Sequence, residues 1–411
     1  MADTPWLDLP ASHPFGPHHL PYGVFGPGDH PAGDASRRVG VRIGDQVLDL
    51  GAAAADAGVD WAPAVAGPTL NPLLAAGPAT WASVRAWLAA LLTDPARAGE
   101  VRPHLDALPD VTLHLPVAVA DYVDFYASEH HATNVGRIFR PDGEPLTPNW
   151  KHLPIGYHGR SSTIVVSGTD IVRPTGQRKA PADPAPTLGP SVKLDIECEL
   201  GFVVGGATAL GERVDIDDAD AHLFGVALFN DWSARDLQAW EYVPLGPFLG
   251  KSFASSVAAW VTPLAALGEA RVPLPTQDPV PLDYLRGAEG TAYGLEISME
   301  VRLNGEVVSR PPYRTMYWSP AQMLAHLTVN GARLSDGDLF ASGTVSGPER
   351  EQRGSLLELT WNGTEPLTLG DGSTRAFLED GDTVTITATA PGPDGSVIGL
   401  GEVSGTIHPA I

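Results

Sequence analysis

Side chains able to bind an anion or a cation recur in one stretch, from Asn230 to Lys251. If Asp231 caps a short helix, Arg235, Gln238 and Tyr242 follow it at offsets of four, seven and eleven, which places them on one helix face. An ordinary amphipathic helix carries Leu and Val there, so this polar stripe indicates a binding surface. The alternative is a solvated helix face with surface ion pairs.

The same stretch ends in a loop that carries a cation. Pro244 ends any helix, because the residue before a proline is driven toward extended angles. The loop 246–250 then leads to Lys251, one of only four lysines in the chain. A lysine in such a glycine-flanked loop is suited to holding a negatively charged group.

A second group of acidic residues lies in the segment 192–200, where apolar and polar residues alternate. Alternation predicts a strand, with Asp195, Glu197 and Glu199 on its polar face. On that face the backbones of Glu197 and Glu199 would lie roughly 6.6 Å apart, so both carboxylates can reach one object. Like charges side by side repel, so this face favours a bound cation over a merely solvated surface.

Most of the elements that position these residues read as strands. Residues 40–50 predict a hairpin turning at Gly44-Asp45, and a second hairpin spans 295–308 with its turn at Asn304-Gly305. Further turns are predicted at 336–338, 362–363 and 380–382. No βαβ alternation is present, so the sequence predicts a mostly β (α+β) fold with a large barrel-like or sandwich-like domain.

Two helices outside the polar stretch have clear signals. One is predicted to be capped at Thr80, with Trp81, Val84, Leu88 and Leu91 on its buried stripe. The other is predicted to open at Ser319-Pro320, run to about Val329 and close at Gly331. A proline-punctuated passage, 103–116, places a domain boundary near residue 118, which gives domains 1–118 and 119–411.

Composition excludes several classes of function. The formal net charge is −23, so a phosphate backbone would be repelled and we expect no nucleic-acid partner. The single cysteine, Cys198, excludes an internal disulfide and a cysteine-rich zinc site. We find no phosphate loop of correct spacing, no G-x-S-x-G elbow and no H-E-x-x-H helix. With neither a signal peptide nor a long apolar run, we expect a cytoplasmic protein that spans no membrane.

The sequence resembles the fumarylacetoacetate hydrolase (fumarylacetoacetase) family in stretches that reach from the N-terminal part to the C-terminal third. They are 19–25, 124–136, 149–150, 156–160, 230–236, 240–253, 341–349 and 356–359. The resemblance implies a small SH3-like N-terminal barrel followed by a mixed β-sandwich roll, and a homodimer.

The resemblance also implies ligands for two metal ions. It assigns a divalent ion, usually Ca²⁺, to Asp124, Glu197, Glu199 and Asp231, and four carboxylates suit a hard cation. A second ion, often Mg²⁺, would lie near Asp231, Lys251 and Ser255.

Catalytic and substrate-binding roles come from the same resemblance. The general base corresponds to His131, which Glu358 orients and makes more basic, whereas His130 stands where family members have Gln. Arg235, Gln238 and Lys251 match groups that polarise the substrate or hold its oxyanion. The remaining substrate contacts match Tyr126, Arg140, Tyr157, Tyr242 and Thr344.

The implied reaction is hydrolysis of a carbon–carbon bond in 4-fumarylacetoacetate, a diketone with a carboxylate at each end, to fumarate and acetoacetate. This is the last step of tyrosine and phenylalanine catabolism. Two alternatives stay open: a relative that cleaves, isomerises or decarboxylates another 2,4-dioxo acid, and a silent metal-binding scaffold. The chain is long enough for two domains, and this length favours fumarylacetoacetate hydrolysis over the activity of a superfamily relative on another 2,4-dioxo acid. A scaffold would need neither His131 nor Glu358.

Overall fold

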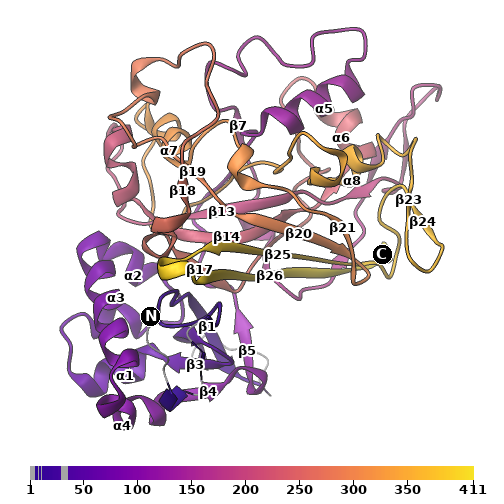
Figure 1. Ribbon diagram of the computed structural model, residues 1–411. Coiled ribbons are helices and arrows are strands. Elements are labelled where there is room, and N and C mark those ends of the chain that lie inside the picture. The colour runs from indigo at the N-terminus through magenta and orange to yellow at the C-terminus, as the bar shows by residue number, and fades with distance from the viewer. Residues whose placement is uncertain (1–4, 8, 11, 29–35) are drawn as a thin grey trace.

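A 13-stranded mixed sheet forms the centre of the molecule in the computed structural model, which describes residues 5–7, 9–10, 12–28 and 36–411 (Figure 1). Its main path runs β4-β3-β2-β1-β17-β14-β13-β22-β6-β7. The strands of this path are β4 (Leu105–Ala107), β3 (Gln46–Asp49), β2 (Arg38–Ile43), β1 (Tyr22–Pro27), β17 (Trp260–Pro263), β14 (Leu223–Asp231), β13 (Cys198–Val204), β22 (Leu339–Ala341), β6 (Tyr122–Phe125) and β7 (Gly156–His158). Off the path lie β5 (Val111–His114), β8 (Ile164–Val166) and β16 (Ser255–Val257).

A five-stranded sheet packs against this one through contacts of β14 with β25 and β26. It comprises β21 (Glu306–Ser309), β20 (Ser298–Leu303), β25 (Thr383–Pro391), β26 (Val397–His408) and β9 (Ile171–Val172). Two-stranded pairs are β10 (Thr175–Arg178) with β11 (Thr187–Pro190), β12 (Leu194–Asp195) with β15 (Ser233–Ala234), β18 (Arg271–Val272) with β19 (Gly294–Leu295), and β23 (Leu367–Thr368) with β24 (Thr374–Arg375). The predicted α+β class is confirmed.

Helices accompany both parts of the sheet. Around the N-terminal strands lie α1 (Leu50–Ala57), α2 (Asn71–Ala75), α3 (Gly77–Thr93) and α4 (Ala98–Val101), and farther along the chain come α5 (Glu129–Phe139), α6 (Arg235–Glu241), α7 (Pro320–Thr328) and α8 (Leu356–Leu359) (Figure 1). Figure 1 places α5, α6 and α8 together beyond one face of the central strands. No helix in the described ranges is long and apolar enough to cross a membrane.

The N-terminal strands join the rest of the sheet directly, because β1 pairs with β17 in antiparallel register, with Tyr22 opposite Val261. One hydrophobic core runs through both parts and includes Val41, Leu88 and Phe229, all fully buried. The division near residue 118 and the SH3-like description of the first part stay predictions.

Both predicted hairpins are confirmed. Strands β2 and β3 turn at Gly44, whose φ is 60°. Strands β20 and β21 turn at Asn304 and Gly305, whose φ angles of 53° and 84° are those of a tight two-residue hairpin turn. Helix α7 begins as predicted, with Ser319 and Gln322 forming a capping box.

Three local predictions are wrong. Helix α3 begins at Gly77, and the Thr80 hydroxyl donates to the carbonyl of Ala76 inside the first turn, so Thr80 is not the cap. Asp231 does not cap a helix: it is the last residue of β14, and α6 starts at Arg235. The predicted strand 192–200 is two strands, β12 and β13, and every residue of β13 is buried.

Candidate active site

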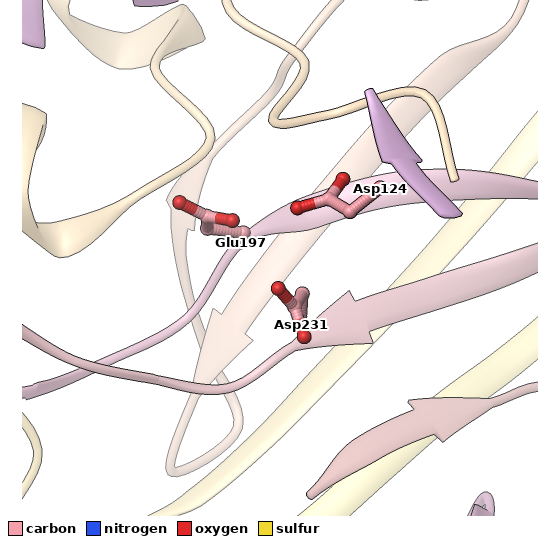
Figure 2. Close-up of side chains that lie close together, drawn as sticks. All are labelled: Asp124, Glu197 and Asp231. Atoms are coloured by element: carbon pink, nitrogen blue, oxygen red, sulfur yellow. The ribbon is translucent and has the colours of Figure 1, made fainter. Parts of the chain in front are cut away.

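Three carboxylates from separate segments meet at one point (Figure 2). Asp124 lies in β6, Glu197 lies in the break between β12 and β13, and Asp231 ends β14. Oxygen atoms of all three lie within 4.8 Å of one another, and Figure 2 shows the carboxylates converging from their separate segments. Strand β13, which follows Glu197, pairs with β14, and β22 lies between β13 and β6, so this part of the sheet holds together residues that are far apart in sequence.

Two buried cations flank this acid cluster. Lys251 Nζ contacts Glu197 Oε2 and lies 2.7 Å from Asp231 Oδ2. Arg235 Nη2 lies 2.8 Å from Glu197 Oε1. The Ser255 hydroxyl donates to Asp231 Oδ1 at 2.6 Å. Of the predicted second-ion residues, Asp231 therefore contacts both Lys251 and Ser255.

Glu199, the fourth predicted metal ligand, is buried beside the cluster but lies outside the group that meets the 4.8 Å distance. Its Oε2 accepts a hydrogen bond of 3.0 Å from the backbone N–H of Gly343. Gly343 has a φ of 76°, and a Cβ there would lie 2.2 Å from the carbonyl oxygen of Phe125, so only glycine fits.

The acid cluster carries more negative charge than its protein partners offset. Burial and the neighbouring Asp231 raise the pKa of Asp124 well above its usual range, and burial with Asp124 does the same to Glu199. Burial also raises the pKa of Asp231. Glu197 is the exception: burial acts to raise its pKa, but Lys251 and Arg235 outweigh burial and lower it.

Two oxygen atoms support a cation at this cluster. Asp124 Oδ1 and Glu199 Oε1 are buried and have no hydrogen-bond partner. A buried carboxylate oxygen without a partner is costly, and a hard divalent cation, which prefers oxygen ligands, is a partner suited to such atoms. The residues therefore fit a metal ion.

His131 faces the cluster from helix α5. Its Nδ1 lies 2.7 Å from Glu358 Oε2, and its Nε2 lies 4.0 Å from Glu197 Oε1. The side chain of Ser128 caps α5 by accepting a hydrogen bond from the backbone N–H of His131. The ring also makes an edge-on contact with Tyr126, with centroids 5.3 Å apart.

Glu358 is fully buried and ionised. Burial acts to raise its pKa, but His131 and hydrogen bonds from neighbouring side chains lower it. Those donors are Asn134 Nδ2 at 2.9 Å, Ser346 Oγ at 3.0 Å and Ser355 Oγ at 2.8 Å. With an anion at Nδ1, that nitrogen carries the proton and Nε2 keeps a free lone pair toward the cavity. His131 is thereby set up as a base.

Sequence reasoning missed these three donors, although two had a signal. Asn134 follows His131 by three residues, a spacing that places both on one helix face. Ser355-Leu-Leu-Glu358 has the spacing of a capping box. Ser346 had no local signal, because only the fold brings it to Glu358.

A cavity of about 420 Å³ opens in front of His131 and the acid cluster. Of the predicted site residues, it is lined by Asp124, Tyr126, His131, Arg140, Tyr157, Glu197, Arg235, Gln238, Tyr242, Lys251 and Thr344. Arg140 and Tyr242 are exposed, whereas Thr344 is buried and its hydroxyl has no hydrogen-bond partner. Three residues of the predicted polar stripe, Arg235, Gln238 and Tyr242, therefore line this cavity, whereas Asp231 does not.

Hydrogen bonds hold two of the lining side chains in place. Gln238 Oε1 accepts a hydrogen bond of 3.1 Å from Arg235 Nη1, and the Tyr157 hydroxyl lies 3.4 Å from Asp231 Oδ2. Asp231 and Ser255 line a second cavity of about 350 Å³, and Lys251 lines both cavities.

An acid cluster that fits a metal ion, beside a carboxylate-oriented histidine at a cavity, is typical of a hydrolytic enzyme that uses water as its nucleophile. Residues 18–116 match the family model of the fumarylacetoacetase N-terminal region, and residues 121–408 match that of the fumarylacetoacetate (FAA) hydrolase C-terminal region. The chain belongs to the fumarylacetoacetate hydrolase family and is an enzyme of that family.

Relatives in several organisms are similar over nearly the whole chain. The fumarylacetoacetase of Homo sapiens is 46% identical over 414 residues, which is 96% of each chain. That of Arabidopsis thaliana is 43% identical over 420 residues, 98% of each chain. Among solved structures, a fumarylacetoacetate hydrolase from psychrophilic Exiguobacterium antarcticum has a TM-score of 0.55 at 18% identity, covering 95% of this chain and 99% of that one, which shows a shared fold.

Proposed function

We propose that this protein hydrolyses 4-fumarylacetoacetate to fumarate and acetoacetate, a step of tyrosine and phenylalanine catabolism. The proposal rests on the identity of more than 40% with named fumarylacetoacetases over nearly the whole chain. The structural observation that carries it is the placement of His131, with Nδ1 on Glu358 and Nε2 directed at a cavity that is lined by Asp124, Glu197 and Arg235.

His131 begins the reaction by taking a proton from water at Nε2. The hydroxide adds to the carbonyl carbon next to the fumaryl group, while ionised Glu358 stabilises the charged ring through Nδ1–H. A base placed in this way contributes roughly 10²–10⁴ in rate. When the tetrahedral adduct collapses, the carbon–carbon bond breaks and its electron pair leaves with acetoacetate as an enolate. The proton on His131 then returns to that carbon.

The cavity's cations stabilise the charge that develops. Arg235 and Lys251 are fixed by buried carboxylates, so they are ready to face an oxyanion without rearrangement, and Gln238 is held by Arg235. Arg140 at the exposed end of the cavity would bind a terminal carboxylate through a fork of hydrogen bonds. Tyr126, Tyr157, Tyr242 and Thr344 complete the contacts with the substrate.

A hard divalent cation, which we propose is Ca²⁺, would be held by Asp124, Glu197, Glu199 and Asp231. When bound it would supply Lewis acidity toward the keto oxygens of the substrate. A second ion, proposed as Mg²⁺, would lie near Asp231, Lys251 and Ser255, which line the second cavity.

The test is turnover of 4-fumarylacetoacetate by purified protein, followed by loss of diketone absorbance and by detection of both products. We expect turnover to stop after chelation and to return with Ca²⁺. Other 2,4-dioxo acids serve as competing substrates. Faster turnover of one of them would assign the protein to another activity of the superfamily, and no turnover of any would indicate a scaffold.

Three further proposals concern the whole protein. We propose a homodimer in the cytoplasm, and a division into domains 1–118 and 119–411, which the two family matches support by meeting between residues 116 and 121. Light scattering of the purified protein tests the dimer, and expression of 119–411 alone tests the division.

A further inference from the structure

Asp195 is a fully buried carboxylate that connects two parts of the site. It lies at the end of β12, two residues before Glu197. Its Oδ2 accepts hydrogen bonds from Arg235 Nε at 2.8 Å and from the backbone N–H of Leu357 at 3.0 Å. Its Oδ1 accepts from the backbone N–H groups of Ile196 at 2.8 Å and Leu356 at 2.7 Å. It lines neither of the two cavities described above.

The first connection fixes the direction of the Arg235 guanidinium. With Nε on Asp195, Nη2 lies against Glu197 and Nη1 donates to Gln238. A guanidinium is planar, so holding one edge defines where the other edge lies. Without Asp195, the edge that faces the cavity would lose this constraint.

The second connection anchors helix α8, which carries Glu358. This helix has only four residues, and a helix so short is not stable by itself. Its first N–H groups have no partner within the helix, and those of Leu356 and Leu357 are satisfied by Asp195. The carboxylate that holds Arg235 therefore also holds the turn from which Glu358 reaches His131.

We propose that Asp195 is a positioning residue that fixes Arg235 and the Glu358–His131 pair relative to each other. The catalytic part of this inference rests on the proposed function, because it assigns Arg235 to the oxyanion and His131 to the base. The structural part, a link between α6 and α8 through one carboxylate, does not.

Only a carboxylate satisfies this position. Each oxygen of Asp195 accepts from two N–H donors. An asparagine has one oxygen and one NH₂ group, so in either orientation its NH₂ would face two donors. Asp195→Asn therefore breaks the link on one side while keeping the volume of the side chain.

The first experiment compares the kinetics of Asp195→Asn with those of wild type. We expect kcat to fall about 10²-fold, because misplacing catalytic groups by about 1 Å has effects of that size, and KM to change little, because Arg140 and Tyr242 are untouched. The matched control is Asp382→Asn. It removes another buried carboxylate that binds an arginine, Arg375, and this pair lies outside the site. Equal losses of kcat in both variants would overturn the proposal.

The second experiment does not depend on catalysis or on the folding of Asp195→Asn. Among the described residues, no hydrogen bond or ion pair joins Arg235 directly to α8. The shortest connection runs through Asp195 alone, whereas the other runs through Glu197 and His131, so we expect Arg235→Lys to loosen α8 chiefly through Asp195. We expect faster amide hydrogen exchange in residues 355–359 of Arg235→Lys, with α7 unchanged as the internal control. Unchanged exchange in 355–359 would overturn the link. Absence of turnover in wild type would instead contradict the proposed function.

Discussion

At the scale of single residues, the site depends on which nitrogen of His131 carries its proton. A buried anion at Nδ1 fixes the tautomer, and that anion, Glu358, is kept ionised by three further hydrogen-bond donors. Neighbouring His130 lies outside the cavity and is only half buried. Both histidines lie in helix α5, in which adjacent residues point in different directions.

We expect His131→Ala to lower kcat by roughly 10²–10⁴, the range typical of a lost general base. The fold should be retained, because the ring makes one hydrogen bond to Glu358 and leaves other donors on that carboxylate. Turnover of 4-fumarylacetoacetate and the circular dichroism spectrum measure the two effects.

His130→Ala is the matched control, since it removes an imidazole one residue away. It should keep turnover close to that of wild type. If His130→Ala were the inactive variant and His131→Ala active, the base would be the other ring and the role of Glu358 would have to be assigned again.

At the scale of elements, the helices and hairpins that have local signals could be predicted from the sequence. The prediction failed for segments whose structure depends on burial on both faces. Alternation in 192–200 gives a polar face, but in the structure Asp195, Glu197 and Glu199 are as buried as the apolar residues of β13. The spacing of Asp231 and Arg235 looks helical, yet Asp231 ends a strand because β14 pairs with both β13 and β16. Such pairings are non-local and leave no mark within either segment.

Helix α5 gives a prediction at this scale, because its cap also holds His131. Ser128→Ala removes the oxygen that accepts the His131 N–H, and should lower the free energy of unfolding by about 1 kcal/mol. It should also lower kcat, since the first turn carries the base. Denaturant unfolding and turnover measure these two quantities.

The matched control for that variant is Ser319→Ala, the buried cap of α7, whose oxygen accepts the Gln322 N–H. It should cost similar stability and leave kcat unchanged, because α7 carries none of the site residues. If both variants kept full kcat, the cap of α5 would matter for stability alone.

At the scale of the whole molecule, the sheet concentrates acidic groups in the interior of a chain that is already strongly negative. Strands β6 and β14 and the segment just before β13 come from three separate parts of the chain, and the sheet brings Asp124, Glu197 and Asp231 into one small volume. The identities of these acids could be predicted from the resemblance. Their shared burial, and the two oxygens left without partners, could not, because both depend on the packed sheets.

This concentration of charge predicts how stability depends on an ion and on pH. The folded-state pKa values of Asp124, Glu199 and Asp231 are raised, chiefly by burial. Without a bound ion, the contribution of these three groups to stability is therefore fully present below the ordinary carboxyl pKa, which is near 4. That contribution is lost as pH rises through the raised pKa values. Glu197 and Glu358 have lowered pKa values, so their contribution is lost instead as pH falls. A bound cation offsets the first loss, and protons compete with it for the same oxygens.

We therefore expect Ca²⁺ to raise Tm after chelation, by an amount that grows between about pH 5 and 8. At an ion concentration a hundred times Kd, binding adds about 2.7 kcal/mol to stability. Asp124→Asn should lose most of this gain. Asp338→Asn should keep it, because Asp338 is a buried carboxylate, with its pKa raised to about 6 by burial, outside the acid cluster. A full gain in Asp124→Asn, or a gain that shrinks as pH rises, would mean that the ion acts on the negative surface and not at the three converging acids.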